Sequence, residues 1–208
     1  MKKTLIFDFD GTLVDSFGLV FNCVNKLSQK YHYDVFENPD FWRSKSLKEI
    51  VSQDVDLNII SRLFFIRDIK KLMNQEYHTL SLFEGIHSLL IKLNRDYDIG
   101  IVTTNSSHNV QLILNKYHID FISFIYADIS IFGKSRALRR ILKKNHLHQD
   151  NTIYIGDEQR DIESAVKSGV SSIAVSWGFN SRELLLTTHP TYIVDTIPEL
   201  YTTIRNVL

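Results

Sequence analysis

Four acidic side chains stand after short apolar segments of this chain. Asp8 and Asp10 come at and just past the end of residues 4–8, and Asp157 and Asp161 follow a later apolar segment. The carboxyl ends of parallel strands meet at one edge of a sheet, so we expect the four carboxylates to converge. Clustered carboxylates repel one another and cannot all ionise without compensation. A hard divalent cation with oxygen ligands supplies it, so the pattern predicts a magnesium (Mg²⁺) site.

Hydrogen-bond donors and a positive charge follow other predicted elements. Thr103 ends a predicted strand, and the amides near Thr104 and Asn105 lie where a helix is expected to begin. Lys134 precedes a further predicted helix and adds an ammonium group. A site with a cation, an ammonium and free backbone N–H groups suits a phosphoryl group. A small phosphorylated metabolite is therefore the expected partner.

The spacing of Asp8 and Asp10 allows a division of tasks. Only Phe9 separates them, and alternate side chains of an extended segment share a face. If extended geometry persists through Phe9, both carboxylates point the same way. One can attack phosphorus as a nucleophile. The other, when protonated, can donate to the leaving oxygen and later accept a proton from water.

Four short motifs together resemble a known family. The segment DFDGTLVDS, residues 8–16, closely resembles the first motif of the haloacid dehalogenase superfamily. The other three motifs follow in order, at Thr103, at Lys134, and at Gly156-Asp157 with Asp161. The resemblance spans roughly residues 4–176, and its branch is similar to phosphoglycolate phosphatase and β-phosphoglucomutase. It implies an α/β fold with a Rossmann-like core and a phosphatase activity that uses Mg²⁺.

The resemblance also implies a role for each motif residue. Asp8 would be the nucleophile and a magnesium ligand. Asp10 would be the general acid and base and would bind the metal through its backbone carbonyl. Thr12 would hold Asp10 and its loop in place. Thr103 would hydrogen-bond the phosphoryl group, and Lys134 would neutralise charge on the phosphate and on Asp8.

The last motif would complete the metal site. Asp157 would bind the metal directly, and Asp161 would act through water or through Lys134. Glu158 adds a carboxylate beside Asp157 and is an alternative ligand. The residues predicted to help bind the substrate or its phosphate are Phe9, Thr12, Thr104, Asn105, Arg43 and Lys45.

The block from 16 to 80 differs in character from the rest of the chain. Its apolar residues recur at helical spacing, no segment reads as a strand, and Ser46 with Glu49 forms a capping box. We interpret residues 16–80 as an inserted all-helical cap domain and residues 1–15 and 81–208 as the core domain. In similar proteins the cap loop near Arg43 and Lys45 faces the phosphate site, so these two basic residues would meet a second anionic group of the substrate. The alternative is a solvated loop.

From residue 85 onward, predicted helices and strands alternate. This alternation favours a parallel sheet covered on both faces. The strands are predicted at residues 99–103, 122–127, 152–155, 172–175 and 192–194. The helices are predicted at residues 86–93, 110–117, 137–144 and 162–167, with a last one from Pro198.

Composition excludes several other classes of protein. Lys and Arg number 24 and so do Asp and Glu, so the formal net charge is zero and gives no footprint for nucleic acid or an anionic membrane. The single cysteine, Cys23, permits no internal disulfide. The apolar run before Asp8 is too short for a signal peptide, and no stretch is long enough to span a bilayer. A cytoplasmic location is expected, while the sequence leaves the oligomeric state undetermined.

Other activities share this set of residues. A dehalogenase would not need Asp10 or magnesium, and a phosphonatase would recruit a cap lysine such as Lys45. A phosphomutase would use the same residues and return the phosphoryl group to an intermediate. A non-catalytic phosphate-binding or regulatory module would be expected to lack a motif residue, and none is missing here.

Overall fold

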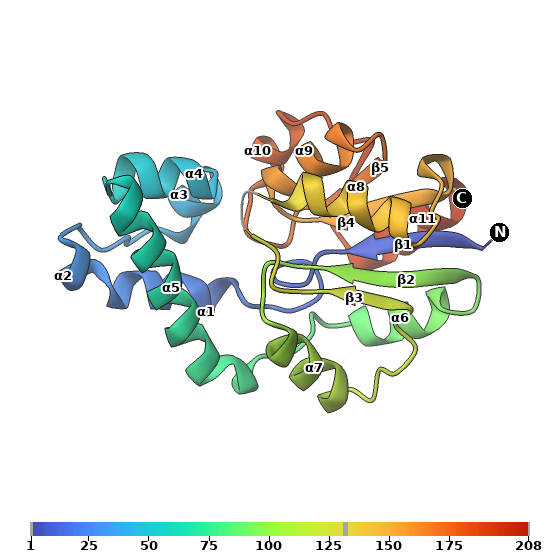
Figure 1. Ribbon diagram of the computed structural model, residues 1–208, viewed down its shortest axis with the longest axis horizontal. Helices are drawn as coiled ribbons and strands as arrows, with labels where there is room; N and C mark the ends of the chain where they lie inside the picture. Colours follow the sequence, from blue (N-terminus) through green and yellow to red (C-terminus); the bar gives the residue numbers. More distant parts are fainter. Residues whose placement is uncertain (1, 131–132, 208) are drawn as a thin grey trace.

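The computed structural model describes residues 2–130 and 133–207 and has an α/β fold (Figure 1). Its six parallel strands lie in the order β3-β2-β1-β4-β5-β6. The strands are β1 (Lys3–Phe7), β2 (Tyr97–Val102), β3 (Phe124–Tyr126), β4 (Thr152–Gly156), β5 (Ser171–Val175) and β6 (Tyr192–Val194). Strand β1 lies between β2 and β4, so the loops that follow these three strands meet at one edge. The predicted fold class is confirmed.

The central strands are buried on both faces of the sheet. Alternate residues of β1 point to opposite sides: Leu5 and Phe7 join one apolar cluster, and Ile6 joins another with Tyr154 of β4. Such nearly continuous apolar segments are typical of parallel strands covered by helices on both faces. Burial of these side chains therefore holds the central strands in the interior of the fold.

Helices cover the two faces of the sheet. Helices α6 (Ile86–Leu93), α7 (Ser107–Lys116) and α11 (Ile197–Val207) contribute to the cluster that contains Leu5. Helices α8 (Lys134–Lys144) and α9 (Gln159–Lys167) contribute to the cluster on the other face. The short helices η3 (Gln149–Asn151) and α10 (Arg182–Leu186) were not predicted from the sequence. Across residues 2–130 and 133–207, no helix is both long and apolar enough to cross a membrane.

Between β1 and β2, Figure 1 shows a separate group of helices beyond the carboxyl ends of the strands. It comprises α1 (Phe17–Lys26), α2 (Ser28–Tyr31), α3 (Pro39–Arg43), α4 (Leu47–Glu49), η1 (Ile50–Asp54), α5 (Ile59–Glu76) and η2 (Tyr77–Thr79). We call this group the helical insertion. The predicted capping box is present at Ser46 and Glu49. An apolar cluster that includes Trp42 and Phe65 lies mostly within the insertion and extends to Phe179 of the core. The exact domain boundaries stay a prediction.

Two adjacent segments of backbone connect the insertion to the core. The amide of Asp15 donates to the carbonyl of Ser81 at 3.0 Å, and the amide of Phe83 donates to the carbonyl of Leu13 at 3.0 Å. The outgoing and returning chains therefore pair directly after the loop that carries Asp8 and Asp10.

A polar contact joins α2 to α5 inside the insertion. Asp68 accepts hydrogen bonds from Lys30 and, at 2.8 Å, from the hydroxyl of Tyr31. The hydrogen bond from Lys30, followed by that from Tyr31, lowers the pKa of the Asp68 carboxyl below its ordinary value. A carboxyl whose pKa is lower in the folded state stabilises the fold above its unfolded-state pKa of about 3.9. That contribution is lost as the pH falls through the folded-state pKa.

We expect Asp68→Asn to lower the free energy of unfolding by roughly 0.5–1 kcal/mol near pH 7, since the partner Lys30 is largely solvated. The difference from wild type should shrink as the pH is lowered from 6 to 3. Urea unfolding across this range measures it. The matched control is Asp34→Asn at an exposed position of the same insertion. A difference that stays constant down to pH 3 would contradict the assignment.

Candidate active site

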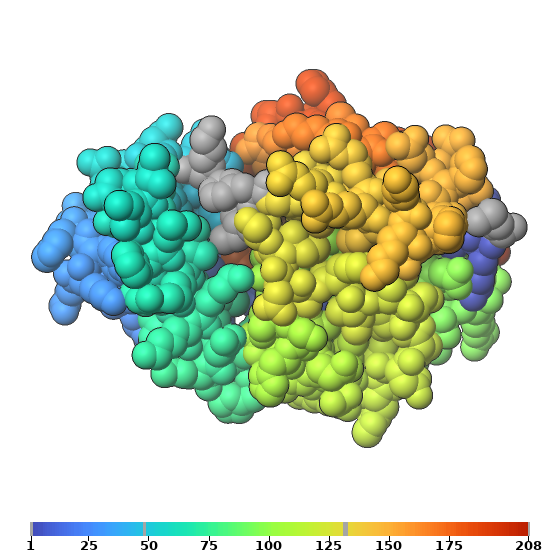
Figure 2. Space-filling model, viewed as in Figure 1, coloured from blue at the N-terminus to red at the C-terminus, as the bar shows by residue number. Residues whose placement is uncertain are grey.

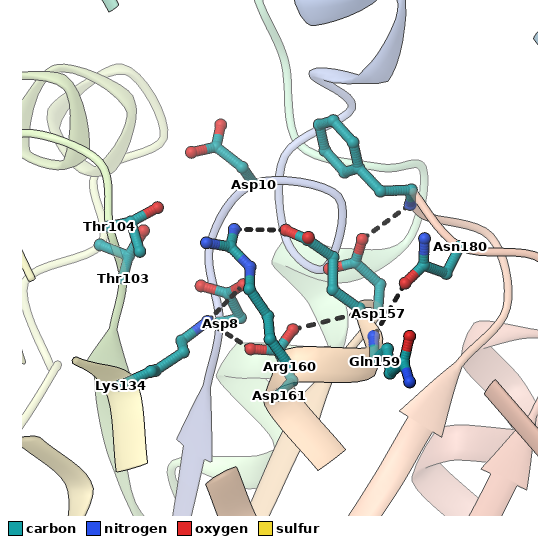
Figure 3. A network of polar contacts seen from close by, with 12 residues as sticks. Asp8, Asp10, Thr103, Thr104, Lys134, Asp157, Gln159, Arg160, Asp161 and Asn180 are labelled. Carbon is teal, nitrogen blue, oxygen red and sulfur yellow. Dashed lines mark hydrogen bonds and ion pairs between the residues drawn. The ribbon is translucent and has the colours of Figure 1, made fainter. Parts of the chain in front are cut away.

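Three buried carboxylates meet at the carboxyl edge of the sheet (Figure 3). Asp8 directly follows β1, Asp157 directly follows β4, and Asp161 lies in the first turn of α9. Each offers a carboxylate oxygen, and these oxygens lie within 4.8 Å of one another. At most 3% of each residue is exposed. Three oxygen donors crowded at such distances fit a hard divalent cation, which would relieve their repulsion.

Lys134 supplies a positive charge that partly balances the three carboxylates. Its ammonium lies 2.8 Å from Oδ2 of Asp8 and also contacts Asp161. Burial lowers the pKa of Lys134, but the charges of Asp161 and Asp8 outweigh burial and raise it above its ordinary value. Burial and repulsion from Asp161 raise the pKa of Asp8 to about 7, against the opposing effect of Lys134. The lysine is therefore held as a cation directly beside Asp8.

Asp157 is held on both carboxylate oxygens. The hydroxyl of Thr12 donates to Oδ1 at 2.6 Å, and the amide of Phe179 donates to Oδ2 at 2.7 Å. Burial, with repulsion from Asp161, raises the pKa of Asp157 well above its ordinary value. Sequence reasoning assigned Thr12 to Asp10, whereas its hydroxyl contacts Asp157, because that carboxylate packs against the same turn.

Glycine makes room for this carboxylate on two sides. A Cβ at Gly11 would lie 2.1 Å from Oδ2 of Asp157, and a Cβ at Gly178 would lie 2.2 Å from the same atom. Gly11 also has a φ of 75°, in the left-handed region that favours glycine. The position of Asp157 thus depends on two loops that each have a glycine where they contact its carboxylate.

Asp10 lies two residues beyond Asp8 and has different partners. The hydroxyl of Tyr77 donates to Oδ1 at 2.8 Å, and the side-chain amide of Asn105 donates to Oδ2 at 2.7 Å. Burial raises the pKa of Asp10, while these two hydrogen bonds oppose the rise. Tyr77 was missed as a site residue because its helical spacing indicated only a core position. The sequence carries no signal that its hydroxyl meets Asp10.

The second motif lies beside the first. Thr103 is buried, and its hydroxyl oxygen accepts a hydrogen bond from the amide of Asn105 at 3.0 Å. Thr104 lines the cavity described below, and its carbonyl accepts from Lys70 at 2.9 Å. The side chain of Phe9 is buried in the apolar core. Phe9 can therefore approach a phosphoryl group only through its backbone.

A cavity of about 270 Å³ lies between this edge of the sheet and the helical insertion. Asp10, Asn105, Glu158 and Arg160 line it from the core, and apolar side chains line it from the insertion. Figure 2 shows the insertion, in blue and teal, abutting the core, in green to red. The helical insertion therefore forms one wall of the cavity in front of Asp10.

The structure does not bring Arg43 and Lys45 to this cavity. The ammonium of Lys45 lies 2.6 Å and 2.8 Å from the two oxygens of Asp54 in the same insertion. The guanidinium of Arg43 lies 4.2 Å from the ring centroid of Phe17. Their backbone carbonyls contact the core instead. The carbonyl of Lys45 accepts a hydrogen bond from the side-chain amide of Asn180, and the carbonyl of Arg43 accepts one from the backbone amide of Ser181. Lys45 is held by the carboxylate of Asp54 and Arg43 by the ring of Phe17, so neither basic group reaches the cavity.

Two other cationic residues line the cavity, and sequence reasoning missed both. Lys70 belongs to α5, and Arg160 belongs to the first turn of α9. Arg160 forms an ion pair with Glu158, whose carboxylate lies outside the group formed by Asp8, Asp157 and Asp161. The one signal in the sequence that pointed to Arg160 was its positive charge within the acidic motif at residues 157–161. Lys70 stands in an ordinary helical pattern.

Known proteins resemble this chain in sequence over most of its length. Residues 5–175 match the family model described as haloacid dehalogenase-like hydrolase. The chain belongs to this family. It is 31% identical over 202 residues to a phosphoglycolate phosphatase of Synechococcus elongatus, covering 95% of each chain. It is 27% identical over 210 residues to the pyrophosphatase PpaX of Oceanobacillus iheyensis, covering 96% of this chain and 95% of that protein.

A solved structure agrees in fold. The haloacid dehalogenase-like family hydrolase of Streptococcus pneumoniae superposes with a TM-score of 0.82 at 23% identity, covering 98% of both chains. The family model and the phosphoglycolate phosphatase of Synechococcus elongatus place the chain in the phosphoglycolate phosphatase-like branch of the family. The protein is accordingly a phosphatase enzyme.

We expect Gly178→Ala to lower phosphatase turnover at least about tenfold, because the added methyl group would displace the carboxylate of Asp157. Turnover of p-nitrophenyl phosphate and urea unfolding measure activity and stability in parallel. The matched control is Gly18→Ala in α1, where an added Cβ meets nothing within 4 Å. This control should keep its turnover and gain up to about 1 kcal/mol in unfolding free energy. Unchanged turnover in Gly178→Ala would contradict the role of the glycine.

Proposed function

We propose that this chain is a magnesium-dependent, cytoplasmic phosphatase that hydrolyses a small phosphomonoester through a phosphorylated Asp8. One observation carries the proposal: Asp8 is buried against Lys134 in a group of three carboxylates, and Asp10 stands two residues away with different partners. A nucleophile and an acid with separate environments are what this reaction requires.

The first half of the reaction transfers the phosphoryl group to the protein. A carboxylate oxygen of Asp8 attacks phosphorus as the bond from phosphorus to the ester oxygen breaks. Asp10, held by Tyr77 and Asn105, donates a proton to the departing oxygen, which leaves as an alcohol. Lys134 offsets the negative charge on Asp8 and on the transferred group.

The second half regenerates the enzyme. Water attacks phosphorus, the bond from phosphorus to the Asp8 oxygen breaks, and Asp10 accepts the proton that the water loses. Inorganic phosphate then departs and Asp8 is a free carboxylate again. The helical insertion, which covers the cavity, is suited to exclude bulk water while the ester is bound.

Asp8, Asp157 and Asp161 would hold the Mg²⁺, and the backbone carbonyl of Asp10 is a further candidate ligand. When bound, the ion supplies positive charge that lets an anionic phosphate approach an anionic nucleophile. The fit rests on the donor set, since buried carboxylate oxygens are ligands that Mg²⁺ prefers.

We expect Asp8→Asn to lower the release of inorganic phosphate at least about a thousandfold, because the nucleophile is removed. Wild type should lose its activity in EDTA and regain it with added Mg²⁺. Acid-quenched wild type should carry an acyl phosphate that the variant lacks. The control is Asp150→Asn, at an exposed position remote from the site. Full activity of Asp8→Asn would reject the mechanism, and an acyl phosphate without phosphate release would favour a phosphomutase.

Tyr77→Phe tests the role of Asp10 as the general acid. The change keeps the buried ring and removes only the hydroxyl that donates to Asp10. We expect kcat to fall about tenfold for an alkyl phosphate, which needs a proton on its leaving oxygen, and much less for p-nitrophenyl phosphate, which does not. KM should stay within about twofold. Tyr192→Phe, on the edge strand β6, is the matched control. An equal loss with both substrates would indicate a structural role.

A further inference from the structure

The cavity in front of Asp10 has two unlike ends. Nine of the eleven described lining residues contributed by the helical insertion are apolar, among them Val20, Trp42, Ile66 and Met73. The core end carries polar and charged groups, namely Asp10, Thr104, Asn105, Ser106, Asp128, Glu158 and Arg160. A wall of this composition is suited to bury hydrocarbon and would desolvate a charged group at a cost.

The position of Asp10 fixes how an ester would lie in this space. If Asp10 protonates the departing oxygen, as the proposed function holds, that oxygen lies next to it. The organic part of the ester then has to extend from Asp10 into the cavity and meet the apolar wall. The apolar character of that wall therefore indicates the chemical class of the organic group.

Arg160 lines the core end of the cavity, across from the apolar wall, and is suited to bind an anion. Its Nη2 pairs with Glu158, but its Nε and Nη1 are buried and have no acceptor among the described residues. Figure 3 draws Arg160 among Asp8, Asp10 and Asp161. Buried donors of a charged group that stay unpaired are costly, and phosphoryl oxygens are strong acceptors for a guanidinium. The unpartnered donors thus point to an anion at this end of the cavity.

From these two observations we infer that the cavity binds a phosphomonoester whose organic group is mainly apolar, with Arg160 donating to its phosphoryl group. This inference rests on the proposed function and narrows its substrate class to alkyl or aryl phosphates. An ester with a second anionic group would place that charge among the apolar side chains. Lys70 lies at the exposed side of the cavity, where its ammonium already donates to the carbonyl of Thr104.

A homologous series of esters tests the inference. Ethyl, butyl and hexyl phosphate carry the same phosphoryl group and similar leaving oxygens, so differences between them report burial of the alkyl chain. We expect kcat/KM to rise about two- to fourfold for each added methylene and to be higher for hexyl phosphate than for 2-phosphoglycolate or pyrophosphate. Equal values across the series, or a preference for the doubly anionic compounds, would overturn the substrate class.

Ile66→Thr asks whether the apolar wall is responsible. Ile66 lines the cavity and belongs to none of the apolar clusters of the fold, so the change should leave folding intact. We expect the ratio of kcat/KM for hexyl over ethyl phosphate to fall at least about threefold. The matched control is Ile60→Thr, the same change on the same helix at a residue that is 67% exposed. An unchanged ratio in Ile66→Thr would contradict the inference.

Arg160→Gln and Arg160→Lys test the anionic end. If Arg160 contacts the phosphoryl group, the inhibition constant of inorganic phosphate and KM for every ester should rise by one common factor, about tenfold for the glutamine variant. The lysine variant, which keeps the charge, should recover part of the loss. If Arg160 only supports the fold, stability falls while the inhibition constant stays unchanged, and the assignment to the phosphoryl group is wrong.

Binding to Asp8→Asn separates the inference from the proposed function. Calorimetry with ethyl, butyl and hexyl phosphate measures affinity without turnover. Affinity that rises with chain length in this variant, without hydrolysis by wild type, would uphold the inference for the cavity and reject the phosphatase mechanism. Hydrolysis by wild type with affinity independent of chain length would do the reverse.

Discussion

The repulsion among three buried carboxylates and its balance by Lys134 is the constraint on which the site depends. Asp8, Asp157 and Asp161 lie too close together and too far from water to be stable as three unscreened anions. The lysine contacts two of them, which leaves room for a further positive charge. The three carboxylates are therefore suited to bind a further cation beside Lys134.

The sheet and its loops meet this demand with little freedom. The ends of β1 and β4 are adjacent because the strands pair in register, with Phe7 opposite Ile155. Buried side chains on both faces prevent either strand from sliding, since a shift of one residue would exchange the two faces. Glycines at 11 and 178 then let two loops close around Asp157. The core thus holds the three carboxylates in fixed positions.

The helical insertion contributes in a different way. Tyr77 follows α5, at the end of the insertion, and its hydroxyl holds Asp10, while Asn105 holds the same carboxylate from the core. Asp10 is thereby positioned jointly by both parts of the molecule. The insertion also supplies the apolar wall of the cavity, so its side chains both hold Asp10 and border the space in front of it.

The sequence by itself determined the α/β class, the helical nature of the insertion and the family, because periodicity and short motifs are local properties. It also singled out Asp8 and Asp157, since strand ends of a parallel sheet converge, and Asp161 and Lys134, through four motifs in order. Tertiary structure alone decided that Thr12 faces Asp157, that Tyr77 meets Asp10, and that Lys45 pairs with Asp54. The contact of Thr12 depends on how the loop after β1 packs against the end of β4, and the other two contacts depend on how the helices of the insertion pack. Side-chain type and spacing along one element carry no record of that packing.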